Sequence, residues 1–201
     1  MVDFFIQGGG FMWPILIALL FGLAIIGERA YSLVNSISNT DQFFEDVKST
    51  FDNTGKEQAI ELCENTSGPV ASIFYAGLSK MEKTKEEIEK AVQNAGGLEM
   101  AFLEKNMIWI NSVITIAPML GFTGTVVGMI KAFEDIKMAN DISPAVVAGG
   151  ISQALLTTAF GLIVAMIMQV AQNFFVSMID KLILDMEEQS IKIVDYLHRS
   201  K

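Results

Sequence analysis

The chain has 201 residues, of which 51% are hydrophobic, and its formal net charge is −9. Its mean hydropathy of +0.42 comes from long charge-free runs, a pattern typical of a membrane protein rather than of a soluble core. The acidic balance argues against a nucleic-acid-binding protein, because such proteins need basic patches. The single cysteine, Cys63, excludes an internal disulfide and a cysteine-based zinc cluster, so we expect no metal site and no cofactor.

The first charge-free run covers residues 4–27 and predicts one transmembrane helix at residues 11–27, after a glycine-rich loop. Trp13 and Pro14 suit a helix start at a membrane interface. No lysine or arginine precedes Arg29, so the run lacks the basic segment of a cleavable signal peptide. We therefore expect this helix to remain as a membrane anchor.

Two further charge-free runs cover residues 106–130 and 142–179. They predict transmembrane helices at residues 106–130 and 143–179, joined by a loop at residues 131–142, and Ser143-Pro144 reads as an N-cap followed by a first-turn proline. The expected fold class is thus an all-α integral membrane protein with three transmembrane helices.

The orientation follows from the basic residues near the membrane. Arg29 follows the first span, Lys105 precedes the second and Lys181 follows the third, so all three mark the cytoplasmic side. This places residues 1–10 and the 131–142 loop in the periplasm, although the loop contains two lysines beside its three acids. Residues 28–105 and 180–201 are then cytoplasmic.

The cytoplasmic segment reads as a series of helices. Turn signals separate expected helices at residues 40–51, 56–64 and 70–81, and Thr84 with Glu87 forms a capping box before another helical pattern. We expect this last helix to continue into the second span, weakened locally by Gly96-Gly97, and the third span to continue inward through residues 180–201. Such long helices cannot bury their apolar faces alone, which predicts self-association.

Small and polar residues form stripes on the second and third spans. Gly121, Thr125 and Gly128 share one helix face, and Ala154, Thr158, Gly161, Ala165 and Gln169 form a similar stripe. Gly124 and Gly128 also make a GxxxG pair. The stripes fit close helix packing or a polar pore lining, and the two readings are compatible. The chain lacks the nucleotide-binding, zinc-protease and Ser/His/Asp patterns, so we expect no enzyme active site.

Residues 117–129 (APMLGFTGTVVGM) and 150–162 (GISQALLTTAFGL) resemble the ExbB/TolQ/MotA proton-channel family, and the length and three spans favour ExbB or TolQ over MotA. The resemblance implies a homo-oligomer, expected to be a pentamer, in the bacterial inner membrane. This pentamer surrounds a dimeric, single-span ExbD- or TolR-like partner whose aspartate carries the proton, and a TonB- or TolA-like protein passes on the energy. Thr125, Thr158 and Gln153 would line the proton path. The expected pore-helix packing residues are Gly121, Gly124, Gly128, Gly161, Ala154, Ala165 and Pro118.

Two positions depart from the family pattern. Gln153 stands where ExbB and TolQ usually have glutamate, and Ile167 stands where they have proline. Glutamine hydrogen-bonds but does not titrate, so neither the second nor the third span contains an ionisable residue. Any proton acceptor must therefore come from a partner.

Three classes of function remain open at this point. The leading hypothesis is an ExbB-like stator and channel subunit that energises TonB-dependent outer-membrane transport, with a TolQ-like role in cell-envelope integrity as the close alternative. A non-conducting membrane scaffold, with membrane lipid and the acidic cytoplasmic helices as its contacts, is a different class. An enzyme is the third, and no clustered nucleophile, base or metal set supports it.

Overall fold

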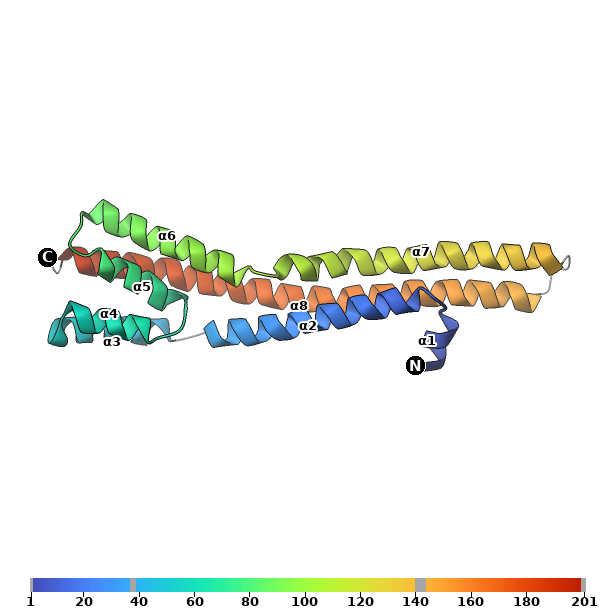
Figure 1. The fold of residues 1–201 in the computed structure, drawn as a ribbon, viewed down its shortest axis with the longest axis horizontal. Helices are drawn as coiled ribbons and strands as arrows, with labels where there is room; N and C mark the ends of the chain where they lie inside the picture. The colour runs from blue at the N-terminus through green and yellow to red at the C-terminus, as the bar shows by residue number, and fades with distance from the viewer. Residues whose placement is uncertain (1, 37–38, 140–143, 200–201) are drawn as a thin grey trace. The chain divides into compact units, whose positions relative to one another are not determined.

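The structure is a computed structural model that describes residues 2–36, 39–139 and 144–199, with the backbone alone described for residues 2, 3, 139 and 144–146. In these ranges every regular element is a helix, as the sequence predicts (Figure 1). The helices are α1 (Val2–Gln7), α2 (Met12–Ser36), α3 (Thr40–Thr54), α4 (Lys56–Glu64), α5 (Pro69–Ser79), α6 (Lys85–Leu103), α7 (Met107–Ala139) and α8 (Pro144–Arg199).

Three stretches of the described chain are long and apolar enough to cross a membrane: Met12–Ser36, Lys85–Met138 and Val147–Arg199. Each of them overlaps one of the three charge-free runs of the sequence, so the protein is a multi-pass membrane protein. The chain divides into two compact units, which we describe separately. One comprises Met1–Glu28 and Asn106–Phe174, and the other comprises Arg29–Lys105 and Phe175–Lys201.

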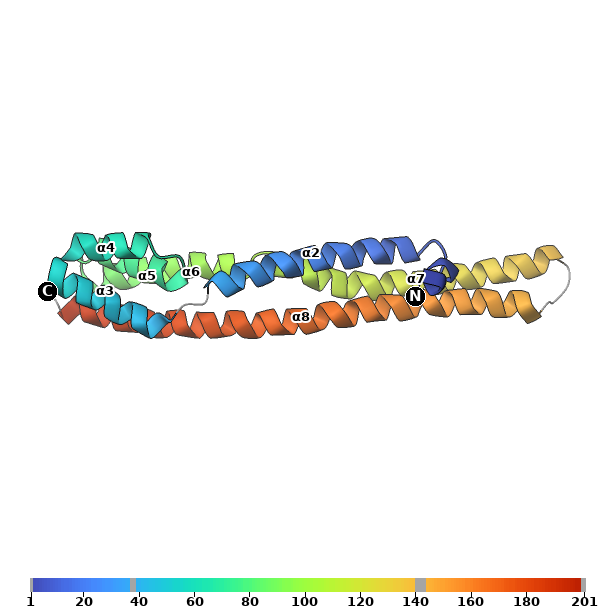
Figure 2. The same cartoon turned by 90° about the horizontal axis from the view of Figure 1, so that it is seen from below.

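The first unit is a bundle of α2, α7 and the N-terminal part of α8, which Figures 1 and 2 show side by side. A Cβ placed on Gly22 of α2 would lie 2.5 Å from Sδ of Met168, so α2 approaches α8 closely at this glycine. The loop expected at residues 8–10 is present, and Gly9 adopts a φ of 74° there. The short α1 before it was not predicted.

The structure differs from the prediction of a loop at residues 131–142. The described part, residues 131–139, is helical and extends α7 beyond Ile130, and residues 140–143 lie outside the description. Charged residues ended the predicted span, but lysine, alanine, glutamate and methionine favour a helix, and no glycine or proline interrupts the segment. The end of a charge-free run is therefore not a helix boundary here.

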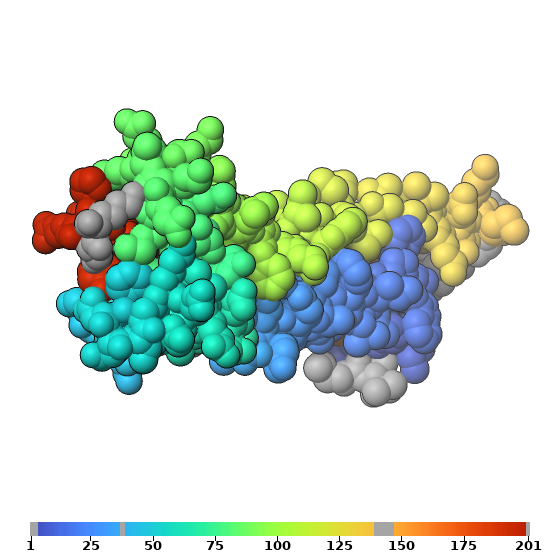
Figure 3. All heavy atoms as spheres, turned by 60° about the vertical axis from the view of Figure 1, so that its left-hand side comes forward, coloured from blue at the N-terminus to red at the C-terminus, as the bar shows by residue number. Residues whose placement is uncertain are grey.

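The second unit packs α3–α6 against the C-terminal part of α8. Its core contains Phe74, Ile88 and Leu197, each fully buried, and Phe43 stacks on Phe74 with ring centroids 5.6 Å apart. Figure 3 shows the side chains of α3–α6 gathered beside the last turns of α8. Each short helix has an apolar face and a polar face, and this arrangement buries the apolar faces.

Local sequence signals place most of the helix ends in this unit. The capping box of Thr84 and Glu87 is present, and α4 has the expected bounds. The first of these helices differs from the prediction: Asn39, not Thr40, accepts the hydrogen bond from the Gln42 backbone N–H at 3.3 Å. That helix also runs on to Thr54, because the break falls at Gly55, whose φ is 99°.

The expectation that one helix continues from residue 85 through the second span is wrong in one detail. The helix passes through Gly96-Gly97 without a break but stops at Leu103, and a turn at residues 104–106 separates it from α7. Nη1 of Arg29, which is almost fully buried, lies 3.4 Å from the backbone oxygens of Phe102 and Leu103 and donates to them. The guanidinium thus gives the last carbonyl of the helix, that of Leu103, a partner from outside the helix, and adds to the Lys105 backbone N–H that already donates to the Phe102 carbonyl at 3.2 Å. The third long helix, α8, is continuous as expected.

Candidate functional site on helices α7 and α8

Several glycines of the two later spans lie where α7 and α8 approach each other closely. A Cβ on Gly161 would lie 2.5 Å from the Ala117 backbone oxygen, and a Cβ on Gly121 would lie 2.9 Å from the Thr157 backbone oxygen. Real Cβ atoms do not tolerate these distances to backbone atoms, so the two helices can reach this separation only with glycine at both positions. The packing interpretation of the stripes therefore fits the geometry.

Three more of the predicted packing residues, Gly124, Gly128 and Ala154, lie along the same line of contact between α7 and α8, which we call the seam. A Cβ on Gly128 would contact Ala154 at 3.2 Å, and Gly124 faces Thr157 in the same way. Ala154 and Ala165 are buried, whereas Pro118 is half-buried inside α7. The seam thus extends over several turns of both helices.

Three threonine hydroxyls meet at this seam. Thr125 Oγ1 and Thr158 Oγ1 hydrogen-bond to each other, which joins the two residues that the sequence analysis singled out. Thr125 Oγ1 also lies 3.0 Å from the Ala154 backbone oxygen, and Thr158 Oγ1 lies 3.1 Å from the Gly121 backbone oxygen. The small residues of the seam expose these carbonyls across the interface, where the opposite helix can donate to them.

Thr157 is the member of this cluster that sequence reasoning missed. Its Oγ1 donates to the Ala154 backbone oxygen at 2.7 Å and lies 3.4 Å from the Gly121 backbone oxygen. Thr157 is 1% exposed, whereas Thr125 and Thr158 are half-buried. Its position one residue before Thr158 and four before Gly161 was the available signal. We interpret Thr157 as a packing contact buried between the two helices, whereas the hydroxyls of Thr125 and Thr158 stay partly accessible.

Gln153 occupies a different position from the threonine pair. Its side-chain amide lies directly against the α-carbon of Gly9, in the space where a Cβ of any other residue would be. The hydrogen bonds that join Thr125, Thr157 and Thr158 do not include it. Its expected place on the proton path stays a prediction.

The chemistry available at this site is hydrogen bonding. Residues 106–130 and 142–179 contain no Asp, Glu, His, Lys, Arg, Cys or Tyr, so neither span has a group that titrates near neutral pH. In the described part of the chain no group of three His, Cys, Asp or Glu side chains could hold a metal ion. Each threonine has one proton, and carbonyls or the other threonine accept it. The hydroxyl oxygens keep lone pairs for an outside donor.

Comparison with known proteins agrees with a helical membrane protein that has three apolar helices. The family model described as the MotA/TolQ/ExbB proton channel family matches residues 65–188, more than half of the chain. The chain is 28% identical over 188 residues to the "Putative biopolymer transport protein ExbB-like 3" of Synechocystis sp., covering 92% of this chain and 90% of that protein.

Two more relatives extend the range of names. The "Putative biopolymer transport protein ExbB homolog" of Methanothermobacter thermautotrophicus is 28% identical over 181 residues, which cover 89% of this chain and 64% of that protein. The "Tol-Pal system protein TolQ" of Pseudomonas aeruginosa is 28% identical over 117 residues, or 53% and 51% of the two chains. The chain thus belongs to the MotA/TolQ/ExbB proton channel family, whose members are named for channel and transport roles.

Proposed function

We propose that the protein is the stator and channel subunit of an inner-membrane motor driven by the proton motive force. In this proposal it works like ExbB, together with an ExbD-like partner, to energise TonB-dependent outer-membrane transport. The supporting observation is the hydrogen-bonded pair of Thr125 and Thr158 within an otherwise apolar seam. Family membership and the relatives named as biopolymer transport proteins support the same role.

The mechanism assigns solvation rather than proton transfer to this chain. A partner carboxylate that approaches the half-buried face of the pair would lose water, and an isolated charge in a membrane is costly. When the carboxyl is protonated, its O–H donates to a threonine oxygen. When it is ionised, a threonine hydroxyl turns away from its carbonyl and donates to it. The pair thus accommodates both protonation states of the partner.

The energy of proton movement is sufficient for such a cycle. One elementary charge that crosses 100 mV releases about 2.3 kcal/mol, so a few protons supply on the order of 10 kcal/mol. We place the N-terminus in the periplasm and the C-terminus in the cytoplasm, because Arg29, Lys105 and Lys181 mark the inner side. The proposed assembly is a pentamer that holds a dimer of the single-span partner and acts on a TonB- or TolA-like protein.

A TolQ-like role in cell-envelope integrity is the second candidate. It is favoured by the relative named as a Tol-Pal system protein. The two roles predict the same site chemistry in this chain and differ in the downstream protein. Deleting the gene separates them: loss of TonB-dependent uptake supports the ExbB-like role, and detergent sensitivity with intact uptake supports the TolQ-like role.

The direct test co-expresses the chain with a single-span partner that has an intramembrane aspartate. Native mass spectrometry gives the stoichiometry, and a pH-sensitive dye inside liposomes gives proton flux under an imposed potential. Five copies with two partner copies, and flux that disappears when the partner aspartate becomes asparagine, would support the proposal. A complex that forms but never conducts would favour the scaffold interpretation instead.

A further inference from the structure

Gly96 and Gly97 of α6 have no steric reason to be glycine within their own chain. A Cβ on Gly97 would meet no atom within 4 Å, and a Cβ on Gly96 would make only ordinary contacts with Ile73 and Met186, at 3.9 and 4.0 Å. Two adjacent glycines disfavour a helix relative to alanine, yet α6 is continuous through them. They differ in this from Gly121 and Gly161, whose own chain fills the Cβ positions. Because nothing in their own chain requires glycine at these two positions, we infer that another molecule packs closely against them.

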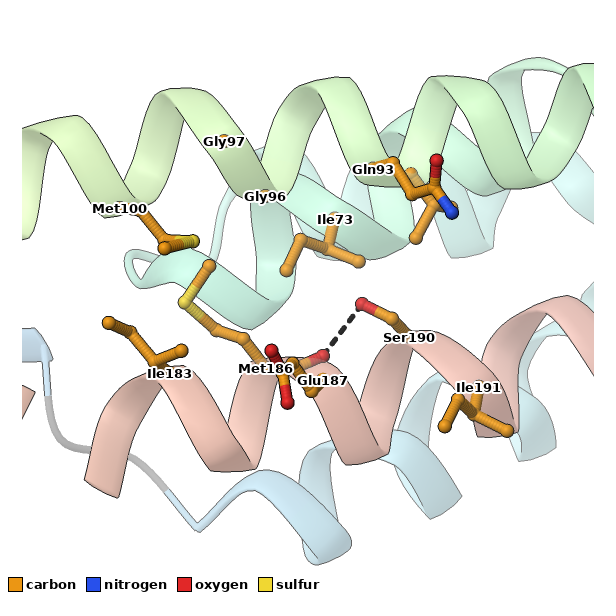
Figure 4. Close-up of a pocket in the computed structure, with 11 residues that line it drawn as sticks. Ile73, Gln93, Gly96, Gly97, Met100, Ile183, Met186, Glu187, Ser190 and Ile191 are labelled. Atoms are coloured by element: carbon orange, nitrogen blue, oxygen red, sulfur yellow. Dashed lines mark hydrogen bonds between the residues drawn. The ribbon is translucent and has the colours of Figure 1, made fainter. Parts of the chain in front are cut away.

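The two glycines open onto a pocket between α6 and α8 in the same unit (Figure 4). Its volume is about 430 Å³, and we call it the glycine groove. Besides the glycines it is lined mainly by apolar side chains, and Figure 4 shows Met100 from α6 and Met186 from α8 pointing toward one another across it. Ile191 at its edge is 67% exposed. An apolar groove bordered by an exposed isoleucine is suited to receive an apolar side chain.

The rim of the glycine groove is acidic. Glu187 lines it directly, and an adjoining hollow that shares Val92 and Ser190 continues it past Glu89 and Asp195. Lys85 is the cation of that stretch, and it already pairs with Glu89 and Asp195 at 3.8 and 3.4 Å. The rim therefore has an excess of negative charge and favours an apolar segment with a cation beside it.

Such a segment lies on the other flank of α6. Leu98 is 74% exposed and Phe102 is 49% exposed, and they are neighbours at i and i+4. At about 100° per residue, Leu98 lies about 160° around the helix from Gly96, so it points away from the groove. Lys105 follows Phe102 three residues later, just past the end of α6. We call Leu98, Phe102 and Lys105 the outer face.

We propose that the glycine groove of one copy receives the outer face of α6 from a second copy of this chain. Leu98 would enter the groove over Gly97, and Lys105 would lie against Glu187. The contact covers the exposed Leu98, Phe102 and Ile191 together. It also explains why residues 96 and 97 are glycines, since a side chain there would fill the space that Leu98 enters. It deepens the proposed function, on which it rests, because it names a surface outside the transmembrane helices through which the copies join.

The proposed contact joins two different surfaces and leaves one of each available on every copy. A heterologous contact of this kind closes into a ring when the rotation between copies permits and otherwise continues as a filament. A two-fold dimer would instead need a surface that matches itself. The groove contact therefore supports a ring of copies.

Disulfide trapping in native membranes tests the contact. Two differently tagged copies are co-expressed on a Cys63→Ala background, one with Leu98→Cys and the other with Ile191→Cys. Oxidation is expected to give a product that contains both tags. The matched control replaces Ile191→Cys by Gln58→Cys, which is also at an exposed position but on α4. Adding Gly97→Leu to the groove copy is expected to lower the yield at least tenfold, while Gln58→Leu leaves it unchanged.

Each outcome bears on the proposal. A Leu98–Ile191 product no stronger than the Gln58 control overturns it, and so does trapping of Ile191→Cys to a protein other than this chain. A Cβ at Gly97 meets no atom of its own chain within 4 Å, so Gly97→Leu is expected to fold, and unchanged yield and helicity of the variant check this. An oligomer that forms without the trapped product leaves the proposed function standing and removes only the groove contact. If the trapped product forms but the complex conducts no protons, the groove contact stands and the proposed function falls.

Discussion

Nδ2 of Asn106 donates a hydrogen bond to Oε2 of Glu28 across 3.2 Å. Among the described non-glycine residues, Asn106 alone has a positive φ, 65°. Asparagine is one of the few residues that adopt this conformation readily, because its short side chain hydrogen-bonds locally. The turn between α6 and α7 thus depends on both the backbone and the side chain of one residue.

Replacing Asn106 separates these two contributions. Asn106→Val is expected to lower the free energy of unfolding by about 1–2 kcal/mol, since a β-branched residue is strained at positive φ. Asn106→Gly keeps the backbone conformation and loses only the contact with Glu28, so its loss should be smaller. Thermal unfolding in detergent, followed by circular dichroism, gives the order. Equal losses for the two variants would mean that the backbone conformation contributes nothing.

The end of α6 at this turn could not be predicted from the sequence. Charge-free apolar runs predicted the three long helices, and turn signals with helical periodicity predicted the shorter helices of the second unit, because both kinds of signal need only neighbours along the chain. The turn at residues 104–106 has no glycine or proline, and Arg29, from a distant part of the sequence, satisfies the carbonyls that end α6. Such a termination depends on tertiary contacts that no local pattern reports.

The candidate site also has residues that the sequence predicted and residues that it did not. The i, i+4 and i+7 spacing predicted that Thr125 and Gly121 share a face, and the resemblance paired Thr125 with Thr158. Neither source indicated Thr157, whose role depends on the register between α7 and α8. The side chain of Gln153 turns to Gly9, a contact set by a loop some 140 residues earlier in the chain.

The close approach of α7 and α8 predicts a sharp difference between two glycines of α8. Gly161→Ala is expected to destabilise the protein by about 1–3 kcal/mol, because its Cβ would overlap the Ala117 carbonyl and force the helices apart. Gly149→Ala is the matched control, since a Cβ there meets nothing within 4 Å. Thermal midpoints of the two variants in detergent check this. Similar midpoints would contradict the assigned packing.

The second unit is expected to lose stability in acid. Hydrogen bonds from Lys192 and Gln189 hold the pKa of Asp41 below its usual 3.8. Nζ of Lys192 and Nε2 of Gln189 lie 2.7 and 2.8 Å from its Oδ1. Because the folded-state pKa is the lower one, the stabilisation is complete above about pH 3.8 and is lost as the pH falls through the folded-state value.

Asp41→Asn tests this contribution. The variant is expected to unfold at a lower temperature than the parent at pH 7, and the difference should shrink as the pH falls below 4. The effect is small, since Asp41 is exposed and salt screens it. Asp46→Asn on the same helix is the control. A difference between parent and Asp41→Asn that persists unchanged at pH 3 would show that the pair contributes nothing electrostatic.

Cys63 provides a reporter of unfolding in the same unit. Burial raises the pKa of its thiol to about 12, and the side chain is 3% exposed. At pH 8 such a thiol has on the order of 10³ times less thiolate than a free cysteine, in addition to being shielded. Maleimide labelling of the folded protein should therefore be far slower than labelling of Gln58→Cys on a Cys63→Ala background. Rapid labelling of native Cys63 would mean that α4 opens readily.

The threonine pair makes the decisive prediction for function. Thr158→Val removes a hydroxyl that a partner carboxylate would use, and a hydrogen bond to a charged group is worth about 1.5–3 kcal/mol. Proton flux through the complex should therefore fall by about tenfold or more, while Thr158→Ser, which keeps the hydroxyl, should retain most of it. Thr123→Val is the matched control, because Thr123 Oγ1 donates to the Met119 oxygen of its own helix at 2.8 Å.

The pairing itself predicts non-additivity. If Thr125 and Thr158 act as one unit, the double valine variant should lose little more flux than either single variant. Independent hydroxyls would instead multiply their losses. Full flux in Thr158→Val, with the complex assembled, would remove the pair from the proton path and leave it as packing, and the acceptor site for the partner would then have to lie elsewhere on the bundle.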